Sequence, residues 1–531
     1  MRIKEPNLAA PCKFACPHSV PAQGYVRKVA ERDFETAFKL ITSKNPLQSV
    51  CGYICDHPCE TECTRALMDE PVMIREIKRF VLEYAEKQGW QPEVERSPAR
   101  EEKAAVIGSG PAGLSCAWDL ARAGYKVTMF EAAAEPGGML RYGVPRFRLP
   151  LEILEREIDA LKSLGVEIKT KKALGSDFTL QDLKAQGYEA VFLGLGALKG
   201  SPLGIPGEEA EGCIEASRFL RDCSLNNEMQ IGQRIAVVGG GFTAVDAART
   251  AVRLGAREVF IVYRRTRDEM PALPEEVWEA EGEGVRVMYL VSPREILTHN
   301  GKVAGLRMVT HTLGEYDASE RRKPEEVVGT EFTLEVDTVI SAIGQEVSFS
   351  PSGLKITPQG TIECNPDTGA TSIPWVFVGG DAVTGPSSVI DAVASGKRAA
   401  VSIDKLIAKD ASFLEYPPEL KVVDKEKVLL RVEDLQRKRR VEIEKISPEK
   451  RKTNFEPYTR TLTEEEAVAE ALRCLGCGCG IGCGLCARVC QSFAVNPRDL
   501  DTFLIDEEKC VACGMCFNLC PNDNIEVVRK E

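Results

Sequence analysis

The pattern of apolar and polar positions divides the chain into segments of different character. Apolar residues recur at helical spacing over residues 24–45 and again over residues 70–88. From residue 104 to about 408, short apolar strands alternate with helices, which predicts parallel sheets in doubly wound domains. Residues 409–465 carry charge runs instead of a period, which predicts an extended or partly helical connector that wraps over the surface.

Composition adds one outlier to this picture. The 531 residues include 68 basic and 80 acidic side chains, a net charge of −12, which does not favour a nucleic-acid or anionic-membrane surface. The chain has no run of about eighteen apolar residues and begins without a basic-then-apolar signal pattern, so we expect a cytoplasmic protein without membrane insertion. Twenty residues are cysteine, far more than packing requires.

Sixteen of the cysteines lie in two groups, near the two ends of the chain. They are Cys12, Cys16, Cys51, Cys55, Cys59 and Cys63, and Cys474, Cys477, Cys479, Cys483, Cys486, Cys490, Cys510, Cys513, Cys516 and Cys520. Disulfides are disfavoured because cytosolic thiols stay reduced. Structural zinc is a better rival, since zinc also takes four thiolates at short spacings. The other four cysteines are scattered and are expected to be small packing residues.

The tail distinguishes between zinc and iron. Residues 510–521 read CVACGMCFNLCP, the bacterial ferredoxin run in which three cysteines bind one 4Fe–4S cluster and the fourth binds another. The preceding half, CGIGCGLCARVC at 479–490, has a first gap of three residues and ends before Gln491 instead of proline. Cys477 is therefore an alternative to Cys479 as a ligand.

A glycine-rich turn follows the first apolar strand of the α/β region. Gly108, Gly110 and Gly113 stand in GSGPAG with Pro111 and Ala112, a helical period follows, and the next strand ends at Glu131. This strand–turn–helix order predicts a dinucleotide site. The turn and the helix N-terminus bind the pyrophosphate, and the acid accepts hydrogen bonds from the ribose.

A second turn of this kind has a different strand ending. Gly239, Gly240 and Gly241, with Thr243, follow IAVV, and the next strand ends at Arg264-Arg265 instead of an acid. Two guanidinium groups favour the 2′-phosphate of NADP(H), although NAD(H) stays possible and a solvated basic pair is the plainer alternative.

Further motifs predict the rest of a flavin site. The strand WVFV runs into Gly380 and Asp381, which can receive a ribityl hydroxyl. The helix that starts at Ser388-Val389 directs its N–H groups toward the isoalloxazine ring. The turns at 191–197 and 339–345, the latter containing Gly344, are expected to be crossings between two dinucleotide domains, with plain turns as the alternative.

The order of these motifs resembles a known family. N-terminal cysteine helices, the first glycine turn, GGMLRYGVPRFRLP at 137–150, the GGG turn, VYRR, EMPA and GGD are similar to the NADPH glutamate synthase small subunit. They also resemble the large flavoprotein subunit of electron-bifurcating NADH-dependent ferredoxin:NADP oxidoreductase and the N-terminal half of dihydropyrimidine dehydrogenase. The resemblance covers residues 1–408 and implies FAD, NAD(P)H and two N-terminal 4Fe–4S clusters. It adds Gly138 and Leu140 to the expected cofactor site, and the tail resembles a fused two-cluster ferredoxin module.

The N-terminal segment departs from the family pattern. Two family cysteine positions fall on Lys4 and Asn7, while EALRCLGC at 470–477 matches the missing segment. The family's glutamine ligand falls near Lys78, which leaves Cys51 as its replacement.

Sixteen cysteines at four per cluster then give four clusters. We expect a first quartet (Cys16, Cys51, Cys55, Cys59), a second quartet (Cys12, Cys63, Cys474, Cys477), a third quartet (Cys479, Cys483, Cys486, Cys520) and a fourth quartet (Cys490, Cys510, Cys513, Cys516). The thiolates of Cys474 and Cys477 could also come from a second copy or a partner subunit.

Together the motifs predict an α/β chain with two doubly wound dinucleotide-binding domains, an α-helical iron–sulfur domain before them and a ferredoxin-like domain after them. The expected segments are 1–100 (helical iron–sulfur), 101–230 and 346–408 (FAD), 231–345 (NADP), 409–473 (connector) and 474–531 (ferredoxin-like).

We expect an oxidoreductase subunit that passes electrons between NADP(H) and iron–sulfur clusters or ferredoxin through FAD, in a complex with other redox subunits. Two alternatives stay open: a glutamate synthase small subunit, and a structural electron relay with an idle nicotinamide site. No side chain is nominated as a catalytic acid or base, and the direction of electron flow and flavin bifurcation stay open.

Overall fold

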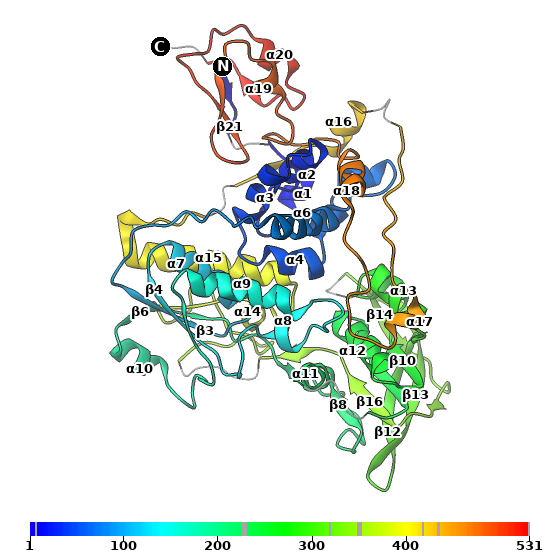
Figure 1. Cartoon of the computed structure of the whole chain (residues 1–531). Coiled ribbons are helices and arrows are strands. Elements are labelled where there is room, and N and C mark those ends of the chain that lie inside the picture. The colour runs from blue at the N-terminus through cyan, green and yellow to red at the C-terminus, as the bar shows by residue number, and fades with distance from the viewer. Residues whose placement is uncertain are drawn as a thin grey trace.

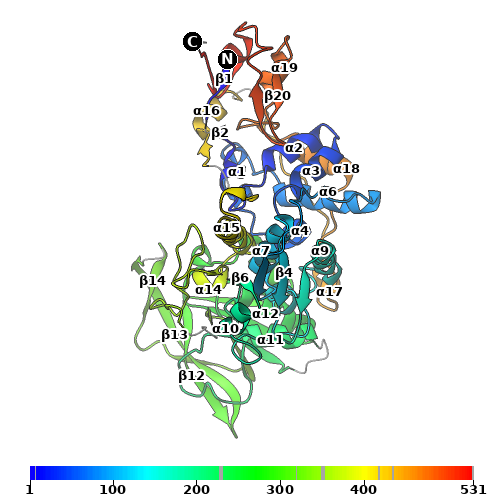
Figure 2. The same cartoon turned by 90° about the vertical axis from the view of Figure 1, so that its left-hand side faces the viewer.

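The computed structural model describes residues 1–5, 8–225, 231–317, 320–347, 353–416, 419–432 and 436–528. Figures 1 and 2 show a small tail domain above a layer of N-terminal helices, with two α/β lobes below them. The predicted fold class is confirmed by these four parts. Asn7, one of the two positions at which family cysteines are missing, lies outside the described residues. Within these ranges, no helix combines the length and the apolar character that crossing a membrane requires.

The N-terminal part consists of helices packed around cysteine-bearing loops. They are α1 (Pro11–Phe14), α2 (Ala22–Ala30), α3 (Phe34–Thr42), α4 (Gln48–Ile54), α5 (Pro58–Thr61), η1 (Thr64–Leu67) and α6 (Ile74–Gln88). The helical period predicted over 24–45 is divided into α2 and α3. Arg32 adopts a φ of 59°, and Asp33 caps α3 by accepting a hydrogen bond from the Thr36 N–H, so the helix restarts there.

The first lobe is built on a parallel five-stranded sheet in the order β18-β6-β3-β4-β5. Its strands are β3 (Lys103–Ile107), β4 (Lys126–Phe130), β5 (Glu167–Lys169), β6 (Tyr188–Leu193) and β18 (Val376–Val378). Its helices are α7 (Pro111–Arg122), α8 (Met139–Tyr142), α9 (Leu151–Ser163), α10 (Leu180–Ala185), α14 (Asp381–Thr384) and α15 (Val389–Ala408). The apolar side chains of α7, α9 and α15 pack with β3 and β4 in one buried core.

The second lobe has a parallel sheet in the order β11-β10-β9-β16-β8. Its strands are β8 (Cys213–Glu215), β9 (Arg234–Val238), β10 (Glu258–Tyr263), β11 (Arg286–Tyr289) and β16 (Thr338–Ser341), and its helices are α11 (Ala216–Leu225), α12 (Phe242–Arg253), η2 (Arg267–Glu269) and α13 (Pro274–Gly282). The sequence-based boundary at residue 230 falls after β8 and α11, but β8 pairs with β16 and α11 packs in the core of this sheet. Pairing with β16, a strand more than a hundred residues away, assigns them to this lobe.

Residues 291–334 differ from the predicted alternation of strands and helices. They form an antiparallel sheet of β12 (Val291–His299), β13 (Lys302–Tyr316), β14 (Arg322–Glu326) and β15 (Phe332–Leu334). Asn300 and Gly301 connect β12 to β13, both with positive φ, as a two-residue hairpin turn requires. The Asn-Gly pair was therefore a hairpin signal that the strand–helix reading missed.

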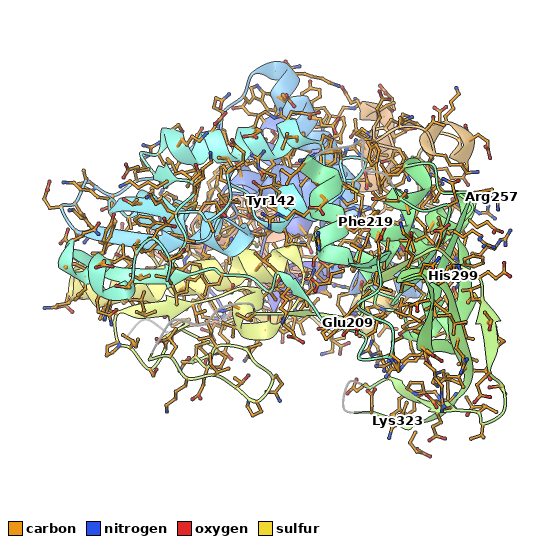
Figure 3. All side chains as sticks on the ribbon, turned by 90° about the horizontal axis from the view of Figure 1, so that it is seen from below. Tyr142, Glu209, Phe219, Arg257, His299 and Lys323 are labelled. Atoms are coloured by element: carbon orange, nitrogen blue, oxygen red, sulfur yellow. The ribbon has the colours of Figure 1, made fainter. Side chains whose placement is uncertain are left out.

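The two segments that cross between the lobes pair with each other. β7 (Lys199–Gly200) and β17 (Gln345–Glu346) are antiparallel, and the Ser201 N–H donates to the Gly344 carbonyl oxygen at 3.0 Å. Figure 3 views the two lobes from below, with Tyr142 of α8 between them and Arg257 at the outer end of the second lobe.

The tail contains α19 (Leu485–Val489), β20 (Val495–Pro497), β21 (Phe503–Ile505), α20 (Met515–Leu519) and β22 (Ile525–Glu526). The first residues of the chain complete it, because β1 (Arg2–Ile3) pairs antiparallel with β22. The Lys4 N–H also donates to the Asn524 carbonyl oxygen at 2.9 Å. The sequence assigned residues 1–100 to one N-terminal segment, and this pairing instead attaches the first residues to the tail.

The connector runs from the first lobe past the N-terminal helices to the second lobe and back. Its elements are η3 (Lys409–Ala411), β19 (Lys421–Val422), which pairs with β2 (Leu8–Ala9), and α16 (Lys425–Leu430), α17 (Pro448–Arg451) and α18 (Glu464–Ala471). Figure 1 shows α17 beside α13 and α18 beside the N-terminal helices. The connector is thus a wrapping arm, as its charge pattern predicted.

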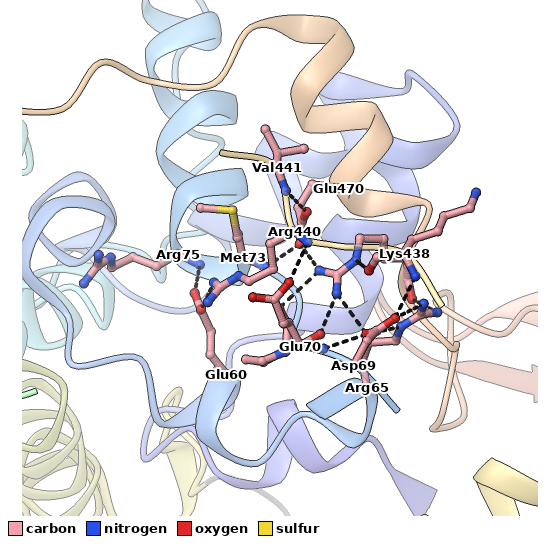
Figure 4. Close-up of polar contacts among 12 residues, drawn as sticks. Glu60, Arg65, Asp69, Glu70, Met73, Arg75, Lys438, Arg440, Val441 and Glu470 are labelled. Carbon is pink, nitrogen blue, oxygen red and sulfur yellow. Dashed lines mark hydrogen bonds and ion pairs between the residues drawn. The ribbon is translucent and has the colours of Figure 1, made fainter. Parts of the chain in front are cut away.

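Buried charged groups fix this arm at two places. In Figure 4, the fully buried Glu470 accepts from the Met73 and Val441 N–H groups at 3.0 and 3.1 Å and from the Arg473 guanidinium at 2.6 Å. At the second lobe, Arg451 forms ion pairs with Glu279 and, at 3.0 Å, with Glu283.

Arg451→Met is expected to destabilise the attachment of the arm. Its side chain is 4% exposed, and its removal takes one buried cation from Glu279 and Glu283. These carboxylates keep Lys445 and the pair Arg249 and Arg253, so the expected cost is that of lost charge-assisted hydrogen bonds, about 1.5–3 kcal/mol. The measurements are the midpoint of thermal unfolding and the rate of protease cleavage between residues 436 and 460. Lys452→Met is the matched control, because within the described part of the chain Lys452 pairs with the exposed Glu449 alone. Equal behaviour of the two variants would contradict the prediction.

Candidate functional site

A cavity of about 1750 Å³ lies between the two lobes. It is lined by eighteen of the nineteen cofactor-site residues expected from the sequence. They are Gly108, Gly110, Pro111, Ala112, Glu131, Gly138, Leu140, Gly239, Gly240, Gly241, Thr243, Arg264, Arg265, Gly344, Gly380, Asp381, Ser388 and Val389. The remaining residue, Gly113, lies behind the first turn.

The first glycine turn combines one position that needs glycine for packing with one that is open. A Cβ on Gly113 would lie 2.0 Å from the Gly108 carbonyl oxygen, so only glycine lets α7 approach β3 this closely. Gly110, in contrast, has a φ of −68° and no atom within 4 Å of an added Cβ. Neither strain nor crowding by the protein explains glycine there, and an open backbone at the start of α7 fits the approach of a pyrophosphate.

Glu131 is held at the end of β4. One carboxylate oxygen accepts from the Ser109 N–H at 3.0 Å and from its hydroxyl at 2.5 Å, and the other accepts from the Ala133 N–H at 2.7 Å. A carboxylate has about four acceptor positions, so Glu131 keeps capacity for a ribose hydroxyl while its orientation is fixed.

The N-terminus of α15 faces the cavity at the opposite end of the flavin region. The helix begins at Val389, where the sequence predicted its start, and the Ser388 hydroxyl accepts from the Asp391 N–H. Asp381 accepts from the Ser387 N–H at 3.1 Å and from its hydroxyl at 3.0 Å. Burial raises the pKa of Asp381, and the Ser387 hydrogen bonds oppose that shift.

The second glycine turn repeats the same arrangement. A Cβ on Gly240 would lie 2.5 Å from the Tyr263 ring, whereas nothing lies within 4 Å of a Cβ on Gly241 at the start of α12. Gly241 has a φ of −91°, so its backbone also does not demand glycine. Open space at both helix starts leaves room for two separate phosphate groups in one cavity.

The structure separates the two arginines that the sequence treated together. Arg265 is buried, forms an ion pair with Asp317 at 2.6 Å and donates to the Arg322 carbonyl oxygen at 2.7 Å. Arg264 is exposed at the cavity wall. Arg264 is therefore the better placed of the two to meet a nucleotide phosphate.

Several cavity residues were missed by sequence reasoning. Arg148 pairs with Asp246 at 2.9 Å and with Glu276 at 3.2 Å, which links the first lobe to α12 and α13 beside the cavity. Arg148 stands in the family motif at 137–150, which was the available signal. Ile54 and Asp56 enter the cavity wall from the N-terminal helices. Only the packing of α4 against the first lobe brings them there.

The second quartet comes together from the two ends of the chain. A small cavity is lined by all four of its members, Cys12, Cys63, Cys474 and Cys477. Burial raises the pKa of Cys12, and the thiols of Cys474, Cys63 and Cys477 add to the shift. The two C-terminal members thus reach the N-terminal helices within one chain.

The first quartet lies between α4, α5 and the start of α15. Cys51 and Cys55 form a buried cluster with Ile390, with Cys16 and Val389 packed against it. Burial raises the pKa of Cys59, and the nearby thiols of Cys55 and Cys16 add to the shift. Because Val389 also lines the large cavity, this quartet borders that cavity.

The tail holds the other eight cysteines in two sets. Burial raises the pKa of Cys479 to about 12, and nearby thiols add to the shift. Those thiols belong to Cys520, Cys483 and Cys486. Burial likewise raises the pKa of Cys516, and the thiols that add to it belong to Cys510, Cys490 and Cys513. Cys477 lies with the second quartet, whereas Cys479 lies among the thiols of the third.

These residues fit the groups that the sequence implied. Open backbone at Gly110 and Gly241 suits two dinucleotides, and four sets of converging thiols suit four-iron clusters. In the described ranges, no three His, Cys, Asp or Glu side chains lie close enough together to hold a single metal ion. Four thiolates around one zinc ion would have to lie about 3.8 Å from one another.

Comparison with known proteins gives three family matches. A model described as pyridine nucleotide-disulphide oxidoreductase matches residues 102–396. One described as dihydropyrimidine dehydrogenase domain II, 4Fe-4S cluster, matches residues 7–90, and a 4Fe-4S dicluster domain matches residues 479–524.

Three relatives illustrate the similarity. The chain is 42% identical to the NADP(+)-dependent formate dehydrogenase subunit beta of Moorella thermoacetica, over 78% of its own length and 62% of that protein's. It is 36% identical to the NADPH-Fe(3+) oxidoreductase subunit beta of Geobacter sulfurreducens, over 89% and 75% of the two chains. The glutamate synthase [NADPH] small chain of Escherichia coli is 36% identical, over 74% and 87%. The chain thus spans less than two thirds of the Moorella relative.

Among solved structures, FprA of Mycobacterium tuberculosis in complex with NADPH matches with a TM-score of 0.52 and 20% identity. The match covers 70% of this chain and 100% of FprA. At this identity the likeness concerns the fold of the two lobes.

Proposed function

The chain belongs to the pyridine nucleotide-disulphide oxidoreductase family, and from this premise we propose that it is the iron–sulfur flavoprotein subunit of an NADPH-dependent oxidoreductase complex. The observation that carries the proposal is the large cavity, because both glycine turns and the N-terminal iron–sulfur part line it. The two proposed nucleotide sites therefore share one cavity, and the first quartet borders it through Val389. We place the protein in the cytoplasm, where its cysteine ligands stay reduced.

Each cavity residue has a role in this proposal. When bound, FAD would take a hydride from the nicotinamide and pass on single electrons. The turn at 108–113 binds the FAD pyrophosphate, Glu131 orients its ribose, and Asp381 receives a ribityl hydroxyl. The N–H groups at the start of α15 would stabilise negative charge on a flavin ring bound in the cavity. The turn at 239–241 binds the NADP(H) pyrophosphate, and Arg264 binds the 2′-phosphate.

We further propose that the four quartets hold four 4Fe–4S clusters in a continuous series. The first and second quartets share short elements, since Cys12 lies in α1 with Cys16 just after it, and Cys59 lies in α5 with Cys63 just after it. Gly478 joins the second quartet to the third. The Gln23 side chain fixes it by accepting from its N–H at 2.6 Å and donating to its carbonyl oxygen at 3.0 Å. The series leads away from the cavity into the tail.

The tail is the proposed point of contact with a redox partner, either another subunit or a soluble ferredoxin. Cys513 of the fourth quartet is exposed, and Val511 beside it is 72% exposed. Met515 and Phe517 are 36% and 38% exposed. Exposed apolar side chains around the last cluster suit contact with another protein. The names of the Moorella and Geobacter relatives, both subunits beta, support a multi-subunit assembly.

A glutamate synthase small subunit is a second candidate, favoured by 36% identity to the Escherichia coli protein over 423 residues. Glutamine-dependent NADPH oxidation with the glutamate-forming partner would distinguish it. A relay with an idle nicotinamide site is less supported, because Gly241 keeps its helix start open and Arg264 stands at the cavity wall.

The test uses the two open glycines as a matched pair. Gly110→Ala is expected to fold normally but to lose bound FAD, because the added methyl group meets no protein atom and occupies the pyrophosphate approach. Gly241→Ala is expected to keep FAD and to lose rapid reduction by NADPH. The measurements are the FAD content of purified protein and anaerobic stopped-flow bleaching of the flavin and cluster absorption. Full FAD in the first variant, or unchanged reduction in the second, would overturn the assignment of that turn.

A further inference from the structure

One buried cation faces the first quartet. Lys78 lies on α6 with 8% of its surface exposed. Burying an ammonium group is costly unless an opposite charge or hydrogen-bond acceptors compensate it. Lys78 must therefore have a compensating partner in its surroundings.

The neighbouring basic residues of α6 have ordinary protein partners. Arg75 donates to the Cys55 carbonyl oxygen at 3.1 Å and pairs with Glu76, and Arg79 pairs with Glu83 at 2.7 Å. For Lys78, the described part of the chain contains no ion pair with a carboxylate and no hydrogen bond. Its compensation has another source.

That source is the set of thiols packed around it. Helices α4 and α6 are in close contact at this point, since a Cβ on Gly52 would lie 3.4 Å from the Cα of Arg79. Gly52 directly follows Cys51 in the sequence, and Arg79 directly follows Lys78. Burial lowers the pKa of Lys78, and the thiols around it raise that pKa above the ordinary value of a lysine, which itself lies well above neutral pH. The thiols belong to Cys51, Cys55, Cys16 and Cys59, the four members of the first quartet.

We propose that Lys78 is a positioning residue that sets the reduction potential of the cluster held by the first quartet, through its buried positive charge. The inference rests on the proposed function, since it requires a cluster at these four cysteines. A four-thiolate cluster is anionic and gains one further negative charge when it accepts an electron. A fixed cation nearby stabilises the reduced form more than the oxidised form, and burial leaves that interaction poorly screened.

The step itself is a one-electron reduction. The electron comes from the flavin side of the large cavity, no bond to Lys78 forms or breaks, and its proton stays in place. Val389 lies against the first quartet and also lines the cavity, so this quartet borders the proposed flavin site. A raised potential there favours entry of electrons into the series of clusters.

The test compares Lys78→Met, Lys78→Arg and Lys87→Met in the full chain. Methionine keeps the length and apolar stem without the charge, arginine keeps the charge, and Lys87 is an exposed lysine on the same helix. Iron and sulfide content is measured first, followed by anaerobic redox titration with low-temperature EPR. In Lys78→Met, one cluster midpoint is expected to fall while the others stay unchanged. Lys78→Arg and Lys87→Met are expected to resemble the parent protein.

The outcomes separate this inference from the proposed function. A parent protein without the iron of the first quartet would contradict the proposed function. If Lys78→Met keeps its full iron and unchanged cluster midpoints, the role of Lys78 is overturned but the proposed function is not. An equal fall of the midpoint in Lys78→Arg would also overturn that role. Lys78→Gln serves as a second neutral variant. Loss of one cluster's iron in both neutral variants would also overturn the role, because Lys78 would then be required for assembly.

Discussion

A chain that ends at Arg473 is expected to keep one iron–sulfur cluster of four. The tail carries the third and fourth quartets, and the second quartet takes two of its members from residues 474–477. Truncation therefore removes eight ligands of two clusters and half of the ligands of another, while the first quartet stays intact. The expected loss is about three quarters of the iron and sulfide, measured by chemical analysis of anaerobically purified protein.

A substitution tests the shared site without removing the tail. Cys474→Ser combined with Cys477→Ser is expected to cost about one quarter of the iron and the EPR signal of one cluster, because a four-iron cluster with two missing thiolates does not persist. Cys364→Ser is the matched control, since Cys364 is a half-buried cysteine of the first lobe outside the quartets. Two complete clusters in the truncated chain would refute the shared quartet.

Arg264→Ala is expected to weaken the preference for NADPH over NADH. The variant loses charge-assisted hydrogen bonds to the 2′-phosphate, which NADH lacks, at a cost of about 1–3 kcal/mol. This corresponds to a roughly 5- to 150-fold weaker apparent affinity for NADPH, with NADH little changed. The measurement is the concentration dependence of anaerobic flavin reduction in a stopped-flow instrument.

The neighbouring arginines serve as controls. Arg257→Ala removes an exposed cation at the outer end of the second lobe and should leave the preference unchanged. Arg265→Ala should instead lower the thermal midpoint of unfolding, because it removes the buried cation that pairs with Asp317 and donates to the Arg322 carbonyl oxygen. An unchanged preference in Arg264→Ala, with the variant fully folded, would sink the assignment of the 2′-phosphate site.

Local patterns were sufficient for the parts of the site that lie on single strand–turn–helix units. The open positions Gly110 and Gly241 and the start of α15 at Val389 lie where their motifs predicted, because each geometry is set within about thirty residues by one strand, one turn and one helix. The tail cysteines are of the same kind, since their spacing along two short loops already groups them.

Other features depended on pairings that a local pattern does not contain. The antiparallel sheet of residues 291–334 interrupts the strand–helix alternation, and only its Asn-Gly turn had a signal in the sequence. The membership of β8 in the second sheet, and of β1 in the tail, follows from hydrogen bonds between strands more than a hundred residues apart. The different roles of Arg264 and Arg265 likewise depend on Asp317, which reaches Arg265 from the antiparallel sheet.

The sequence by itself determined the residue types and their spacing: two glycine-rich turns, a ferredoxin run, and sixteen clustered cysteines that divide evenly by four. Tertiary structure decided which of these parts meet. The charged arm brings Cys474 and Cys477 to Cys12 and Cys63, and buried ion pairs at Glu470 and Arg451 hold it in place. The physical reason is that turns and cysteine loops are specified by neighbouring residues, whereas a site shared by distant segments exists only when long-range burial offsets the entropy of closing the chain between them.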